Sequence, residues 1–97
     1  MNYEKFRFYE KVSRFEDTVT LLTEQIENLS EDIQYGNITQ KLAEQEKRGI
    51  EAGVNQCGKR YLELLEMAPD GEEELMQWMK NWMYGLRKSL EGISGRK

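Results

Sequence analysis

Eight apolar residues recur along the first third of the chain at spacings that alternate between four and three. They are Phe8, Val12, Phe15, Val19, Leu22, Ile26, Leu29 and Ile33. A seven-residue repeat of this kind forms one narrow stripe on a helix, whereas the alternation typical of a strand is absent. We therefore predict a helix over about residues 3–34, roughly 48 Å long at about 1.5 Å per residue. The stripe is typical of a coiled-coil seam.

A second helix is predicted over about residues 38–68. Gly36 is suited to end the first helix in a left-handed conformation. Asn37 then offers an N-cap, with Gln40 in the capping-box position. The apolar stripe of this helix is weak before Ile50 and clear after it, where it comprises Ile50, Val54, Cys57, Tyr61, Leu64 or Leu65, and Ala68.

Glycines interrupt the second helix, and each costs about 1 kcal/mol of helix propensity relative to alanine. Gly49 and Gly53 are separated by one turn within a polar segment. The Gly-x-x-x-Gly motif that joins helices in lipid does not apply to such a segment. We interpret the pair as a place where another helix approaches closely or where this helix bends.

A third helix is predicted over about residues 71–91, because Pro69 ends the second and Asp70 can cap the next, with Glu73 reciprocating. Its apolar arc is about 160° wide, broader than the seam of the first helix. The arc is centred on Leu75, Met79, Trp82, Leu86 and Ile93, flanked by Met76, Met83 and Leu90 on one side and by Trp78 on the other. Residues 93–97 are expected to form a short, flexible, basic tail.

Short connections make consecutive helices antiparallel neighbours. The predicted fold is therefore all-α: a single domain, residues 1–97, built as an antiparallel three-helix bundle with a long coiled-coil hairpin. The third helix should start beside the N-terminus of the first and stop near Leu29. The outer end of the hairpin, around Ile33 and Ile38, should then be partly uncovered.

Composition excludes most catalytic chemistry. The 97 residues include no histidine and one cysteine, so His-based general bases, Cys–His pairs, imidazole metal sites and a disulfide framework are excluded. No apolar run approaches the ~18 residues of a membrane span, and the first residues lack a signal-peptide core. We therefore expect a cytoplasmic protein that does not act on a membrane.

The remaining candidates for chemistry are a thiol and the carboxylates. Cys57 lies on the apolar stripe of the second helix, which favours a packing role. Six acids and no Lys or Arg occur from Glu16 to Asp32, and Glu72 to Glu74 mark a helix start. These patterns lack the ligands of a di-iron bundle or a calcium loop. We predict no catalytic, cofactor-binding or metal-binding residues, and an enzyme acting through carboxylates alone is the weakest of three hypotheses.

Charge gives no clear nucleic-acid signal. The 14 Lys and Arg residues are outnumbered by 18 Asp and Glu, for a net charge of −4. Basic residues gather at both ends of the chain: Lys5, Arg7, Lys11 and Arg14 at one, and Lys80, Arg87, Lys88, Arg96 and Lys97 at the other. The predicted topology separates the two groups, which argues against a continuous basic stripe. The acidic stretches could alternatively mimic a phosphate backbone, although the net charge is modest for that role.

Aromatic residues and methionines are the most distinctive feature. One interpretation is a compact aromatic core where the third helix packs on the first. Another is a partner-binding patch, because Trp, Tyr and Met are enriched at interface cores. A third treats residues 80–97 as an amphipathic membrane-surface segment, at the expense of the bundle's third helix. For the second interpretation, the candidate partner-binding residues are Trp78, Tyr84, Lys80, Lys88, Tyr3, Phe6 and Tyr9.

We expect a small, non-catalytic helical module that occupies the surface of another protein. Small acidic helical chains without reactive residues are common among accessory and inhibitor proteins of phages and mobile elements, an analogy of size and composition. The alternative is a structural coiled-coil protein whose function is its own assembly. A homodimer is the simplest form of the self-association that we expect.

Overall fold

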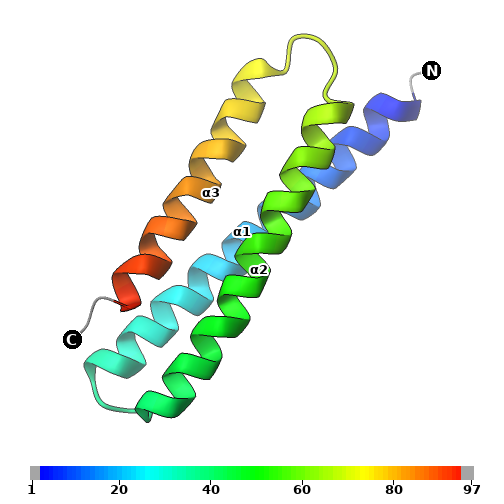
Figure 1. Ribbon diagram of the computed structural model, residues 1–97. Coiled ribbons are helices and arrows are strands. Elements are labelled where there is room, and N and C mark those ends of the chain that lie inside the picture. The colour runs from blue at the N-terminus through cyan, green and yellow to red at the C-terminus, as the bar shows by residue number, and fades with distance from the viewer. Residues whose placement is uncertain (1–2, 95–97) are drawn as a thin grey trace.

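The computed structural model describes residues 3–94, and side chains within residues 5–93. Three helices account for most of them: α1 (Tyr3–Gln34), α2 (Gln40–Met67) and α3 (Glu73–Ser94). The described residues contain no strand, so the all-α prediction is confirmed. The molecule is a rod of 54 × 18 × 17 Å, as Figure 1 shows.

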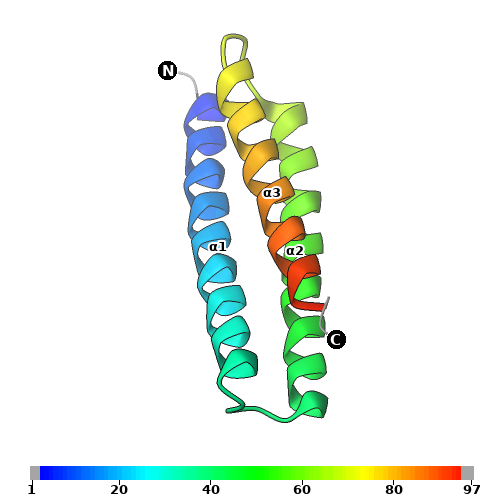
Figure 2. The same cartoon turned by 90° about the vertical axis from the view of Figure 1, so that its left-hand side faces the viewer.

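The helices form the predicted three-helix bundle, with one end of the α1–α2 hairpin not covered by α3. α1 and α2 are an antiparallel hairpin, and α3 starts beside the N-terminal end of α1 and returns along it toward the hairpin loop (Figures 1 and 2). The Tyr9 hydroxyl of α1 donates a hydrogen bond to the Glu72 carboxylate just before α3. This bond places the start of α3 beside Tyr9 along the length of α1. Because α3 ends short of the hairpin loop, Ile33, Tyr35 and Leu42 remain exposed there.

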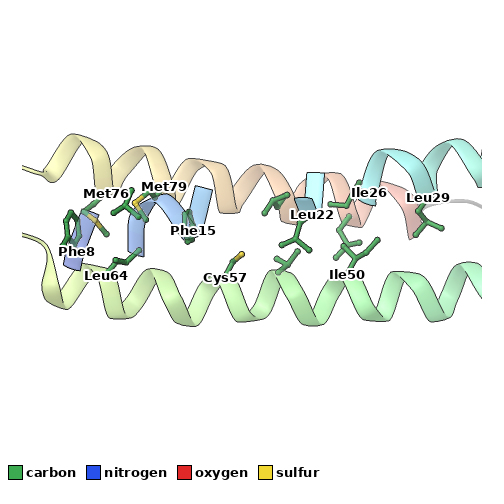
Figure 3. Close-up of a cluster of buried hydrophobic side chains, with 14 residues drawn as sticks. Phe8, Phe15, Leu22, Ile26, Leu29, Ile50, Cys57, Leu64, Met76 and Met79 are labelled. Carbon is green, nitrogen blue, oxygen red and sulfur yellow. The ribbon is translucent and has the colours of Figure 1, made fainter. Parts of the chain in front are cut away.

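The core follows the seven-residue stripe of α1. The buried members of the stripe are Phe8, Val12, Phe15, Leu22, Ile26 and Leu29, which pack with apolar side chains of α2 and α3 along the axis (Figure 3). Val19 is half-buried, and Ile33 is exposed where α3 no longer covers it. Fully burying one such side chain stabilises the fold by about 1.5–3 kcal/mol before entropy is counted.

The first turn confirms one predicted residue and corrects another. Gly36 has the expected positive φ of 69°. The N–H of Asn37, however, donates to the Asp32 carbonyl at 2.8 Å, so this residue completes the end of α1 as part of a Schellman motif. Thr39 caps α2 instead, since its hydroxyl accepts from the N–H of Leu42 at 3.2 Å. α2 therefore begins at residue 40 rather than 38.

The second turn also shifts a boundary. Ala68 is extended, as expected for a residue before Pro69, so α2 ends at residue 67. Gly71 has a φ of 95°, which is incompatible with a right-handed helix. The predicted Asp70 cap is therefore wrong, and α3 begins two residues later than predicted, at Glu73. α3 continues through residue 94, so residues 93 and 94 of the predicted tail are helical, and residues 95–97 lie outside the described part.

α3 buries a different part of its apolar arc from the one predicted. The buried residues are Met76, Met79, Leu86 and Leu90, whereas Leu75, Trp82 and Ile93 are only partly buried. At about 100° per residue, the centre of the buried face is displaced by about 50° from the predicted one. The displacement moves both tryptophans toward the surface.

Candidate partner-binding groove

An open groove runs between α1 and α3 in the half of the bundle nearer the loop that joins α1 to α2. It has a volume of about 290 Å³ and is lined by Val19, Thr23, Ile26 and Glu27 of α1 and by Asn81, Trp82, Gly85, Leu86 and Ser89 of α3. Its floor is apolar, because Ile26 and Leu86 belong to the buried core. The groove is therefore a place where apolar surface of the bundle remains accessible to solvent.

Small side chains keep the groove open. α1 packs far more extensively on α2 than on α3. On α3, Gly85 and Ser89 line the groove with little side-chain volume. A β-carbon at Gly85 would meet no atom within 4 Å, so this position faces open space. A glycine at position 85 therefore makes α3 less stable than an alanine would, and no close internal contact requires it.

Two tryptophans extend the apolar surface toward the start of α3. Trp78 is 60% exposed, while Trp82 is half-buried against the core. Their ring centroids lie 5.4 Å apart at an interplanar angle of 33°. Trp78 also lines a second depression of about 510 Å³ with Glu74, Leu75 and Gln77. Large aromatic side chains of this kind are the commonest hot spots of protein interfaces.

The structure separates the other predicted site residues of α3 from Trp78. Lys80, Tyr84 and Lys88 are exposed on the outer flank, and the Lys88 Nζ lies 5.4 Å from the centroid of the Tyr84 ring. At about 100° per residue, Tyr84 is about 120° around the helix from Trp78. A single flat partner contacting Trp78 and the groove would therefore not also contact Tyr84.

The aromatic residues at the start of α1 have different environments. Tyr9 packs edge-on against Phe8, with ring centroids 5.2 Å apart, and reaches Glu72, which places it beside the start of α3 as expected. Phe6 is 66% exposed. The side chain of Tyr3 lies outside the described part of the structure. The predicted set is thus only partly brought together.

The α1 wall of the groove and Gly85 were not predicted from the sequence. Val19 was predicted as part of the seam, and no periodicity shows that α3 leaves it and Thr23 accessible beside a groove. Gly85 did carry a signal, since a glycine in a helix interior is unfavourable unless packing or function requires it.

A separate cationic depression of about 220 Å³ lies between α1 and α2. Lys11, Arg14 and Arg60 line it with Glu63 and Leu64. Arg60 is directed toward α1 by a hydrogen bond of 3.3 Å to the Thr18 hydroxyl. The sequence grouped Lys11 with Arg14 but did not reveal that the hairpin brings Arg60 beside them.

The only thiol is buried in the core, and burial raises the pKa of Cys57 despite the opposing effect of nearby Arg60.

Within residues 5–93, no three His, Cys, Asp or Glu side chains are placed to hold a metal ion. None of the described helices is long and apolar enough to cross a membrane.

Comparison with protein-family models, curated proteins and solved structures gives no match.

Proposed function

We propose that this protein is a non-catalytic interaction module that binds a partner protein through the α1–α3 groove and the adjoining tryptophan pair. The observation that carries the proposal is the exposure of Trp78 beside an apolar groove that the bundle leaves unfilled. An accessory or inhibitory role, in which the module occupies a functional surface of its partner, is consistent with its small size.

The surface chemistry supports binding rather than catalysis. Trp78 offers a large rigid contact area, and its ring lies against that of Trp82. The groove is open instead of enclosing a small ligand, and its polar groups, Thr23, Asn81 and Ser89, lie on its walls. An apolar centre with polar groups around it is the usual anatomy of a protein interface.

The proposal is tested by paired capture from the source cell. Wild-type protein, Trp78→Ala and Gly85→Leu are used as baits, with Gly49→Leu as the matched control because position 49 also faces open space. We expect at least one protein that the wild type and the control retain and that both groove variants lose. Trp78→Ala should weaken binding by at least about 2 kcal/mol, measured with the purified partner. Equal retention by all four baits would contradict the proposal.

A second candidate function, self-assembly, is favoured by the uncovered hairpin end. Ile33, Tyr35 and Leu42 are exposed there at 40%, 69% and 50%. A homodimer through this end would cover them. Analytical ultracentrifugation of the wild type and of Leu42→Glu decides the matter, because assembly predicts a dimer that the charged residue dissociates. If the wild type stays monomeric at high micromolar concentration, self-assembly is contradicted and partner binding is the remaining candidate function.

A further inference from the structure

The bundle is incomplete on the face that carries the groove. α3 lies in front of α2 in Figure 2, with α1 beside them, so a helix seated between α1 and α3 would complete a four-helix arrangement. Helices in such bundles pack about 20° from parallel along continuous apolar grooves. The lining residues of α3 and the adjoining Leu75 extend over residues 75–89, or about 20 Å at 1.5 Å per residue. This length accommodates about four turns of an incoming helix.

The charged side chains that line the groove and the adjoining depression, among residues 5–93, are both carboxylates. Glu27 lines the groove, and Glu74 lines the depression beside Trp78. By helical position, Glu16 also lies on the same flank of α1, within about 40° of Thr23. The segment from Glu16 to Asp32 contains no Lys or Arg, so the α1 wall has no compensating cation in sequence.

The cations of α3 do not reverse this pattern. Lys80 lies on the opposite flank of the helix. Lys88 lies about 20° beyond the groove-lining Asn81 by helical position, but its ammonium group rests over the Tyr84 ring, on the side away from the groove. The groove therefore presents an apolar floor with carboxylates along its α1 wall and at its upper end.

We propose that the groove binds a cationic amphipathic helix of a partner protein as the fourth helix of the bundle. This inference rests on the proposed function and specifies the partner's chemistry. Apolar anchors about one turn apart would enter beside Trp82 and over Gly85, and flanking Lys or Arg side chains would face Glu16 and Glu27. A second copy of this chain fits poorly, because its net charge is −4 and its most regular apolar stripe is already buried in α1.

Two synthetic peptides test the inference directly. Each has about 18 residues, enough for the four turns that the groove accommodates, with leucines at helical spacing and either lysine or glutamate at the flanking positions. We expect the lysine peptide to bind at least about tenfold more tightly than the glutamate peptide, with affinity that falls as salt is added. The double variant Glu16→Lys/Glu27→Lys should reverse the preference.

Gly85→Leu locates the binding. The β-carbon of a leucine there would meet no atom within 4 Å and the rest of the side chain would extend into the groove, so thermal stability should be retained while affinity for the lysine peptide falls at least about tenfold. Gly49→Leu, on α2, should leave the affinity unchanged and should not lower thermal stability. If both peptides bind equally and Gly85→Leu weakens both, docking in the groove stands and the cationic partner is wrong. If neither binds, or if Gly85→Leu has no effect, the inference is overturned, and paired capture judges the proposed function separately.

Discussion

A β-carbon at Gly53 would lie 2.7 Å from the Cδ2 atom of Leu22, so this glycine sets how closely α1 approaches α2. The contact lies at mid-length, where Leu22 occupies the core with only 5% of its surface exposed. Gly49, one turn away, meets nothing within 4 Å. The close-approach interpretation of the two glycines is therefore confirmed for the second and not for the first.

Leu22→Ala should reduce the free energy of unfolding by about 2–5 kcal/mol, because it leaves a cavity between the two long helices. Denaturant unfolding followed by circular dichroism measures the loss. Leu21→Ala, at an exposed neighbouring position of α1, is the matched control and should have little effect. Equal stability of the two variants would show that the stripe does not form the core.

The two glycines should respond oppositely to alanine. Gly49→Ala should stabilise the protein by up to about 1 kcal/mol through helix propensity alone. Gly53→Ala should lose this gain or become destabilising, since the new methyl group must displace Leu22. In the Leu22→Ala background, Gly53→Ala should stabilise instead, and a double-mutant cycle of unfolding free energies measures the coupling. Additive effects would argue against the contact.

The tryptophans should differ in their effect on folding. Trp78→Ala should leave the melting temperature nearly unchanged, because most of that side chain is exposed. Trp82→Ala should destabilise the fold, by less than the ~3–5 kcal/mol of a fully buried aromatic residue, because Trp82 is only partly covered. Calorimetry of the two variants decides it, and equal, large losses would mean that Trp78 belongs to the core.

Cys57 should make stability fall at alkaline pH. Burial holds the thiol pKa above its ordinary value of 9.0, so the unfolded chain releases this proton at lower pH than the folded one. The stabilising contribution is complete below pH 9 and decreases as pH rises through the folded-state pKa. Relative to Cys57→Ala, wild type should therefore lose unfolding free energy above about pH 9. Parallel pH profiles of the two proteins would contradict a raised pKa.

Several features of the fold follow from local chemistry and were predicted from the sequence. The regular spacing from Phe8 to Leu29 admits only a helical stripe, and Gly36 and Pro69 interrupt helices for reasons that act within a few residues. The start of α3 beside the N-terminal part of α1, near Tyr9, was predicted because the connections between the helices are short. The helix boundary near Asn37 was wrong because Asn37 completes the end of α1 and Thr39, two residues later, caps α2. The boundary near Asp70 was wrong because the positive φ of Gly71 delays the start of α3. In both cases the backbone of the turn decided the boundary.

The sequence alone thus determined the number, order and antiparallel arrangement of the helices, since periodicity and short turns fix these locally. Tertiary packing decided the orientation of α3 about its own axis. An apolar arc as wide as that of α3 can be buried in several rotations, and contact with both other helices selected the one centred between Met79 and Leu90. That rotation exposes Trp78, directs Gly85 into an open groove and leaves Tyr84 on another face, so the candidate site exists only in the assembled bundle.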